Sequence, residues 1–482
     1  MSIKNPLSLS DDHPLYGANE LCTLGAHELR TLYAIGELSP VEVAIATLDR
    51  AEAINPRFNA FTFIDRPGAI RAAQASERRW RAGRPISAID GVPATLKDIV
   101  WVEGLAIRYG SLTTDSAPRT EDAPAVRRLR ANGAIFLGLT TTPEFGWKAV
   151  TDSPFSGITR NPWAPDTTPG GSSGGAAVAA ITGAGVLHLG TDGGGSVRIP
   201  ASFTSIVGFK PTFGQVPAYP ASTFGTVAHI GPMARCVDDV AAMLSAMVGR
   251  DIRDWAQGVS ETTVLVLRDD ELTGSRIGYW STPPGGHVDQ EVSAVVEKAV
   301  DWLRTAGANV ENIDLPGTNL LDLFHHHWFS GAANRLSAIP QELRERMDPG
   351  LLQIAREGAA MSAPSLVAAQ VHRAEFGAAM DRLLVEYDFI VSPGTAIAAF
   401  AAGEEVPRDS GLSRWTEWAG FSYPINLSQQ PACVVPCGRT QDGRPISLQF
   451  VGARGADARV LSAARDFETR CDLNSFSRGR SC

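Results

Sequence analysis

The stretch TPGGSSGGAAVAAITGAGVLHLGTDGGGSVRIP, residues 168–200, decides the fold. It is the part of the chain that is richest in glycine. It contains a run of small residues, 174–182, that predicts a tightly packed helix, and an apolar run, 186–190, that predicts a buried strand. A glycine-rich loop precedes the helix and another follows the strand. This alternation is typical of an α/β protein.

The same alternation continues on both sides of this stretch. Ser39-Pro40-Val41-Glu42 is a capping box with Pro at the first helical position, so a helix is predicted to begin there. Further helices are predicted at 69–81, 123–132, 236–248, 289–306 and 458–469, and strands at 61–64, 134–139, 275–280, 309–313, 388–392, 432–436 and 446–451. Strands separated by helices form a largely parallel or mixed sheet. The sequence therefore predicts an α/β fold in which helices cover both faces of a twisted, mixed β-sheet.

The chain is predicted to form a single large domain over residues 1–482. No internal repeat and no Gly/Ser/Pro-rich linker divides it. Residues 1–85 are expected to form a mainly helical N-terminal layer, and the long helices predicted within 319–386 are expected to form a cap-like region.

The composition, with 44% hydrophobic and 20% charged residues, is ordinary for a soluble globular enzyme. The formal net charge of −9 argues against a nucleic-acid partner, because binding to phosphates depends on Lys and Arg. No run of about 18 apolar residues predicts a membrane span, and the N-terminus has no signal-peptide pattern. We therefore expect a cytoplasmic protein without a membrane partner. Cys433 and Cys437 have no second pair at metal-ligand spacing, so neither a metal nor another cofactor is expected. The sequence makes no prediction of oligomeric state.

Lys97 is the first candidate catalytic residue. It is one of only five lysines in the chain, and it ends the apolar run Val92 to Leu96. Burial lowers the pKa of a lysine, so a buried Lys97 could act as a base. The alternative is a structural lysine that pairs with Asp98.

Two glycine-rich loops carry the other candidates. GGSSGG (170–175) places Ser172 and Ser173 before the predicted helix, and its glycines allow a substrate to approach the backbone closely. GTDGGGS (190–196) aligns successive backbone N–H groups beside Ser196, an arrangement that can stabilise an oxyanion. Asp192 and Arg198 are expected to pair across this loop. The alternative is that both stretches are simply turns.

Two serines and an isolated lysine are sufficient for acyl transfer without a His–Asp pair. Residues 170–174 also match the G-x-S-x-G nucleophile elbow of α/β-hydrolases, in which Ser172 would be the nucleophile. That arrangement requires an Asp or Glu and then a His further along the chain. His372 and Asp388 are the candidates, but they occur in the opposite order.

GGSSGG followed by GTDGGGSVRIPA resembles the amidase signature family. Ser172 lies 75 residues after Lys97, and Ser196 lies 24 residues after Ser172, as expected for the Ser–Ser–Lys triad of that family. Further pieces that resemble the family extend over most of the chain: GVP (91–93), TPEFG (142–146), NPW (161–163), GFKPTFG (208–214), GPMAR (231–235), SPGT (392–395) and LQFVG (448–452). The resemblance implies the amidase signature fold.

It also implies roles for individual residues. Ser196 would be the nucleophile, Ser172 the bridging serine after a cis peptide bond, and Lys97 the base. The oxyanion hole would be formed by the backbone N–H groups of Gly193, Gly194, Gly195 and Ser196. The residues that support both loops would be Ser173, Thr191, Asp192 and Arg198.

The expected activity is hydrolysis of the C–N bond of small apolar or aryl carboxamides, with esters and carbamates as side substrates. VRIP (197–200) differs from the Ile-Arg-Gln-Pro of the amidotransferase subunit, which favours a free-standing enzyme similar to aryl acylamidases. Aromatic residues near the motifs are predicted to line the substrate pocket: Phe145, Trp147, Phe155 and Trp328, with Tyr219 and Phe224 as further candidates. Two alternatives remain, an A-type subunit of an amide-transfer complex and an esterase that uses Ser172.

Overall fold

The computed structural model describes residues 13–258 and 265–471. Its centre is an 11-stranded mixed sheet. In spatial order the strands are β1 (Phe61–Ile64), β3 (Ile135–Thr140), β2 (Pro93–Lys97), β6 (Leu187–Asp192), β8 (His229–Ala234), β7 (Val207–Lys210), β12 (Ala432–Arg439), β13 (Pro445–Val451), β11 (Phe389–Pro393), β9 (Arg276–Tyr279) and β10 (Asn309–Asn312). A separate hairpin joins β4 (Asp152–Ser153) and β5 (Gly157–Ile158). The predicted α/β class with a mixed sheet is confirmed.

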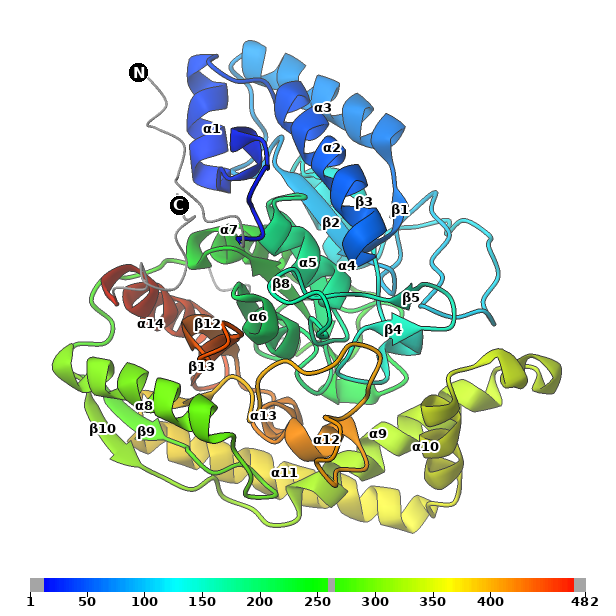
Figure 1. Ribbon diagram of the computed structural model, residues 1–482, viewed down its shortest axis with the longest axis vertical. Helices are drawn as coiled ribbons and strands as arrows, with labels where there is room; N and C mark the ends of the chain where they lie inside the picture. The colour runs from blue at the N-terminus through cyan, green and yellow to red at the C-terminus, as the bar shows by residue number, and fades with distance from the viewer. Residues whose placement is uncertain (1–12, 259–264, 472–482) are drawn as a thin grey trace.

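Helices cover both faces of the sheet (Figure 1). Along β12, Cys433 and Val435 face one apolar cluster, and Ala432 and Val434 face the clusters on the other side. This alternation follows from the period of two along a strand. The helices that pack into the first cluster are α1 (Ala26–Ile35), α4 (Pro124–Ala131), α7 (Val237–Met247), α8 (Gln290–Thr305) and α14 (Asp457–Arg470).

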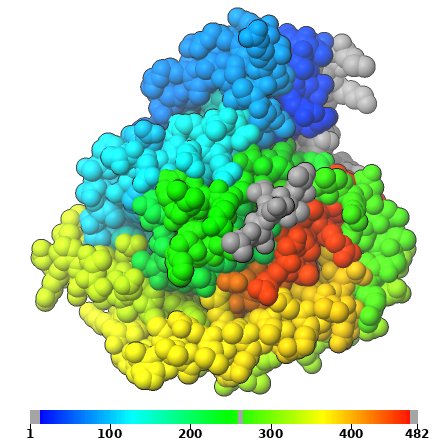
Figure 2. All heavy atoms as spheres, turned by 180° about the vertical axis from the view of Figure 1, so that it is seen from behind, coloured from blue at the N-terminus to red at the C-terminus, as the bar shows by residue number. Residues whose placement is uncertain are grey.

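The opposite face carries the remaining helices. They are α2 (Pro40–Phe58), α3 (Arg66–Arg81), α5 (Gly174–Thr182), α6 (Arg198–Thr204), α9 (Leu320–Ser337), α10 (Pro349–Ala359), α11 (Ala363–Glu386), α12 (Trp415–Trp418) and α13 (Tyr423–Ser428). Figure 1 places α1 to α3 at one end of the molecule and α9 to α11 at the other, and Figure 2 shows residues 320–386 along the lower border from behind.

Local sequence explains where the elements begin. The Ser39 hydroxyl accepts a hydrogen bond from the Val41 N–H at 3.0 Å, and Glu42 accepts one from the Ser39 N–H at 2.8 Å, so the capping box starts α2. The sequence did not predict β7, β8 or α6. Both strands carry glycine or proline within a short apolar run, and these residues weaken a strand pattern.

The order of the strands positions the candidate site. β2 runs parallel to β3 and β6. The carboxyl ends of parallel neighbours meet at one edge of the sheet, so Lys97 at the end of β2 lies beside Thr191 and Asp192 at the end of β6.

Candidate active site

Lys97 is fully buried, and its ammonium position is surrounded by hydroxyl groups. Its Nζ lies 2.6 Å from Ser172 Oγ, 2.9 Å from Thr191 Oγ1 and 3.0 Å from Ser173 Oγ. The sequence predicted each of these four residues as part of one site, and the fold brings them together.

Burial lowers the pKa of Lys97 well below its ordinary value, and the attraction of the Asp192 carboxylate only partly opposes this effect. The structural alternative, a pair with Asp98, is not formed: one Asp98 carboxylate oxygen accepts the Arg108 N–H at 2.8 Å, and burial raises the pKa of Asp98 to about 7. Burial therefore favours the neutral amine form of Lys97.

Ser172 lies in the loop before α5, directly after a cis Gly171–Ser172 peptide bond. Gly171 is required at this point because a Cβ there would lie 2.6 Å from the Val150 carbonyl group. The Ser173 N–H donates to the Ser196 carbonyl oxygen at 3.1 Å, which fastens the two glycine-rich loops to each other. Ser172 and Ser196 both line one cavity.

Of the loop from Gly193 to Ser196, Gly193 and Ser196 line that cavity. The N–H groups of Gly193, Gly194 and Ser196 donate to no other residue in the described part of the chain. Gly195 differs, since its N–H donates to Asp192 Oδ1 at 2.8 Å. The predicted role of Gly195 as an oxyanion donor therefore has no support from these contacts, because its one N–H is engaged by Asp192.

Asp192 and Arg198 form the expected ion pair, and both are completely buried. Arg198 Nε and Nη2 each lie 3.0 Å from the carboxylate of Asp192. Arg198 also donates to Gln449 at 2.8 Å and to Asn426 at 2.6 Å, and Asn426 donates to Asp192 at 2.9 Å. Burial alone would raise the pKa of Asp192, but the charge and hydrogen bonds of Arg198 hold it below its ordinary value.

Sequence reasoning missed the roles of Asn426 and Gln449. Gln449 lies in LQFVG (448–452), a stretch that resembles the family, but nothing in the spacing connects either residue to Arg198. Their amide groups complete a network that fixes the shape of the loop, because every polar atom of the buried pair needs a partner.

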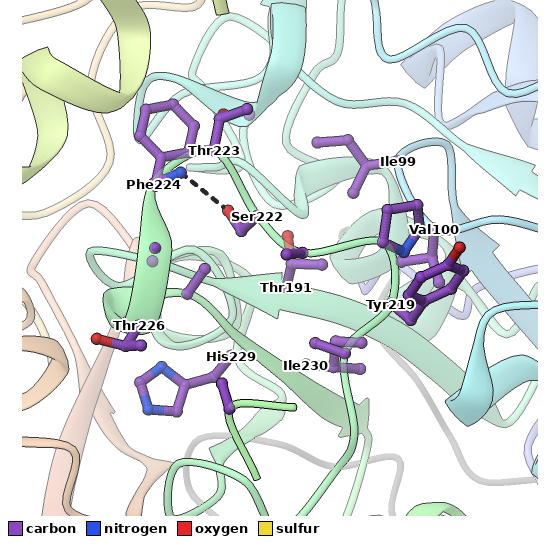
Figure 3. Close-up of a pocket in the computed structure, with 18 of the residues that line it drawn as sticks. Ile99, Val100, Thr191, Tyr219, Ser222, Thr223, Phe224, Thr226, His229 and Ile230 are labelled. Atoms are coloured by element: carbon purple, nitrogen blue, oxygen red, sulfur yellow. Dashed lines mark hydrogen bonds between the residues drawn. The ribbon is translucent and has the colours of Figure 1, made fainter. Parts of the chain in front are cut away.

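The cavity in front of these loops has a volume of about 420 Å³. Phe224 and Thr223 lie across it from Tyr219 and Val100 (Figure 3). Phe145 and Trp328 line it as predicted. Phe224 and Trp328 stack with their ring centroids 3.8 Å apart.

A second series of aromatic rings also lines the cavity. The Trp101 ring lies 6.1 Å from Tyr219, its Nε1 donates to the Tyr109 hydroxyl at 2.6 Å, and the Tyr109 ring lies 5.8 Å from Phe145. Trp101 and Tyr109 were not predicted as pocket residues. The lining of the cavity is therefore rich in aromatic side chains.

Trp147 and Phe155, also predicted as pocket residues, are not among the residues that line this cavity. The Trp147 indole is buried in the apolar cluster near α9 and α10, and a Cβ on Gly350 would lie 2.5 Å from it. The Phe155 ring lies under the Arg108 guanidinium at 4.4 Å. Closeness to a motif in sequence did not fix the direction of these side chains.

The sequence of the chain matches the model of the Amidase family over residues 42–461. The chain belongs to the amidase family. This amidase is 36% identical to an acylamidase of Rhodococcus erythropolis, over 92% of the chain and 95% of the relative. It is 32% identical to the A-type subunit of the glutamyl-tRNA(Gln) amidotransferase of Symbiobacterium thermophilum, over 92% and 95% of the two chains.

Solved structures agree with this assignment. A bacterial aryl acylamidase of the amidase signature family superposes with a TM-score of 0.86 at 27% identity, covering 96% of this chain and all (100%) of the other. A 6-aminohexanoate cyclic dimer hydrolase with bound substrate gives a TM-score of 0.83 at 26% identity, covering 96% and 99%. The amidase therefore has the amidase signature fold and acts on carbon–nitrogen bonds of non-peptide amides.

Two features are absent from the described residues of the amidase. None of its described helices is long and apolar enough to cross a membrane. Nor do these residues contain a group of three or more His, Cys, Asp or Glu side chains that could hold a metal ion.

Proposed function

We propose that the protein hydrolyses apolar and aryl carboxamides through an acyl-enzyme on Ser196, with Ser172 as the proton bridge and Lys97 as the base. The observation that carries this proposal is the 2.6 Å contact between a fully buried Lys97 Nζ and Ser172 Oγ. A buried amine without an acidic partner among its contacts favours the neutral form, which a base requires.

The hydrogen bonds around Lys97 support this direction of proton transfer. A neutral amine has two N–H groups and one lone pair. The Ser173 hydroxyl donates to the Thr191 carbonyl oxygen at 3.3 Å, so it must accept from Lys97. If Thr191 accepts the second N–H, the lone pair faces the short contact with Ser172, and the proton of Ser172 can move to the amine.

The reaction then proceeds in two stages. Ser196 Oγ attacks the carbonyl carbon while its proton passes through Ser172 to Lys97. The C–N bond breaks as the leaving nitrogen takes that proton back, which yields an amine and an ester on Ser196. Water attacks this ester by the same relay, and the products are a carboxylic acid and the free enzyme.

The N–H groups of Gly193, Gly194 and Ser196 would bind the oxyanion in both stages. They are donors without a partner in the described part of the chain, and Gly193 and Ser196 line the cavity. The loss of one such donor typically lowers kcat about 10²- to 10³-fold.

The aromatic walls favour aryl and other apolar amides, and esters and carbamates of the same shape are expected side substrates. The names of an acylamidase and of an aryl acylamidase among the relatives support this substrate class. Together with a cavity of about 420 Å³, these observations indicate a small-molecule substrate.

Two alternatives are less well supported. An esterase with Ser172 as nucleophile needs a His beside it, but His372 is exposed on α11 and Asp388 pairs with Arg459 at 3.1 Å. An A-type subunit of an amide-transfer complex is supported by similarity to the corresponding amidotransferase chains. Such a chain would need a partner for activity.

The test is labelling of the purified chain with a fluorophosphonate, followed by peptide mapping and an assay on 4-nitroacetanilide. We expect the label on Ser196, turnover by the chain alone, and neither in the Ser196→Ala variant. Label on Ser172 instead would favour the esterase. Absence of turnover without a partner protein would favour the amide-transfer complex.

A further inference from the structure

Arg335, on α9, reaches the wall of the same cavity. Its guanidinium carbon lies 4.9 Å from the centroid of the Phe145 ring and 6.0 Å from that of Tyr109. Arg335 is one of the residues that line the cavity. The guanidinium therefore stacks on two rings of the aromatic wall.

Arg335 has no acidic partner within residues 13–258 and 265–471. Its side chain makes no ion pair there, and its buried Nε has no hydrogen-bond partner. Glu144 precedes Phe145 in the chain, but its carboxylate is bonded elsewhere. It accepts the Ser111 hydroxyl at 2.5 Å and the Asp348 N–H at 2.6 Å. A partly buried cation thus faces an apolar cavity with its charge unmatched.

The other charged residues of the cavity are already paired. Arg253 lies between Asp251 at 3.0 Å and Glu121 at 2.5 Å. The Asp254 carboxylate accepts the N–H groups of Ala218 at 2.8 Å and of Ala256 at 3.1 Å. Among the charged side chains that line the cavity in the described part of the chain, the Arg335 guanidinium is therefore the one that is available to bind a ligand.

Phe145 and Gly146 connect the position of Arg335 with that of Ser172. Phe145 carries the guanidinium on its face, and the next residue, Gly146, adjoins Ser172: a Cβ on Gly146 would lie 3.3 Å from Ser172 Oγ. A substrate that lies along Phe145 would have one end at the guanidinium and its amide at the serines.

We infer that Arg335 binds a carboxylate on the substrate, so that the preferred amides combine an aryl or apolar body with one carboxylate. This inference rests on the proposed function and narrows its substrate class. A guanidinium binds a carboxylate through two parallel N–H···O bonds, and these bonds are stronger where water is largely excluded. The apolar walls would hold the rest of the molecule.

Two matched pairs of substrates test the inference. In the first pair, N-(4-nitrophenyl)succinamic acid and N-(4-nitrophenyl)butanamide differ by a carboxylate on the acyl side. In the second, 4-acetamidobenzoate and acetanilide differ by a carboxylate on the leaving group. We expect kcat/KM of the wild type to favour the carboxylate in at least one pair by about 10- to 100-fold, the value of a charged hydrogen bond.

The variants assign that preference to one side chain. Arg335→Met should lower kcat/KM for the carboxylate member of that pair about 10- to 100-fold more than for the neutral member, and Arg335→Lys should retain part of the preference. Arg253→Met is the matched control, because it removes a cavity arginine that is already paired, and it should keep the preference.

Three results would overturn the inference: a wild type that favours the neutral member of both pairs, an Arg335→Met variant that keeps the preference, or an equal loss in Arg253→Met. If Arg335→Met loses activity on neutral amides as well, an Arg335→Lys variant without the preference also overturns it. Continued hydrolysis of neutral amides in any of these cases leaves the proposed function intact, so the two failures are distinguishable.

Discussion

The indole of Trp328 fills the space that a side chain at position 193 would need. A Cβ on Gly193 would lie 2.8 Å from Trp328 Cζ3 and 3.0 Å from its Cη2. The indole cannot easily yield, because its Nε1 donates to the Trp147 carbonyl oxygen at 2.9 Å and its ring stacks on Phe224. The size of residue 193, which borders the proposed oxyanion hole, is therefore coupled to the residue on α9.

A double-mutant cycle measures this coupling. Gly193→Ala should lower kcat/KM for a neutral anilide at least 10-fold, because overpacking of about 1–3 kcal/mol must displace either the loop or the indole. Trp328→Leu should reduce that loss, so that the double variant is more active than additivity predicts. If the losses of kcat/KM in the two single variants add up to the loss in the double variant, the two positions are independent.

The pH dependence of activity should report the pKa of Lys97. The relay needs the neutral amine, so kcat/KM should rise with pH until Lys97 is deprotonated and then stay level. Since burial lowers this pKa well below its ordinary value, the plateau should begin far below pH 10. A rise in kcat/KM that continues to the ordinary lysine range would contradict the assignment of Lys97 as a buried neutral base.

The same pKa makes a prediction about stability. The unfolded chain binds a proton at Lys97 up to about pH 10.4 that the folded chain does not bind, so the unfolded state carries more protons and stability rises with pH. The unfolding free energy of the wild type minus that of Lys97→Met should therefore increase by about 1.4 kcal/mol per pH unit between the lowered pKa and about pH 10.4. Urea titrations at several pH values measure it, and a difference independent of pH would contradict a neutral Lys97.

The ion pair of Asp192 and Arg198 should be essential to stability. Arg198→Met leaves a buried carboxylate without its cation, which typically costs about 3–5 kcal/mol, and urea unfolding should detect this loss. Arg66→Ala is the control: its partners Asp49 and Glu52 are exposed, so its loss should cost about 1 kcal/mol or less. Equal effects of the two variants would refute the structural importance of the buried pair.

The sequence could predict much of this site because its parts are local. Ser172 lies in a glycine-rich loop directly before a helix, and Ser196 lies in one directly after a strand. Lys97 is the last residue of a buried strand. Patterns of this kind are visible within a few residues, and the resemblance to a family connected them.

The remaining features depend on contacts that sequence spacing does not encode. Whether the Gly195 N–H faces the cavity or Asp192 depends on the backbone conformation, in which Gly195 has a φ of 115°. Trp147 and Phe155 differ from Phe145 only in the direction of their side chains. Arg335 is far from every motif, and only the packing of α9 against the aromatic wall brings it to the cavity.

The Arg198 network also determines when activity can arise during biosynthesis. Arg198 relies on Asn426 and Gln449, which are 228 and 251 positions further along the chain. A ribosome that has completed both serine loops has therefore not yet made the amides that anchor them. The growing polypeptide cannot complete the hydrogen bonds of Arg198 until Gln449 has been translated, so a product that stops before Asn426 should not hydrolyse amides.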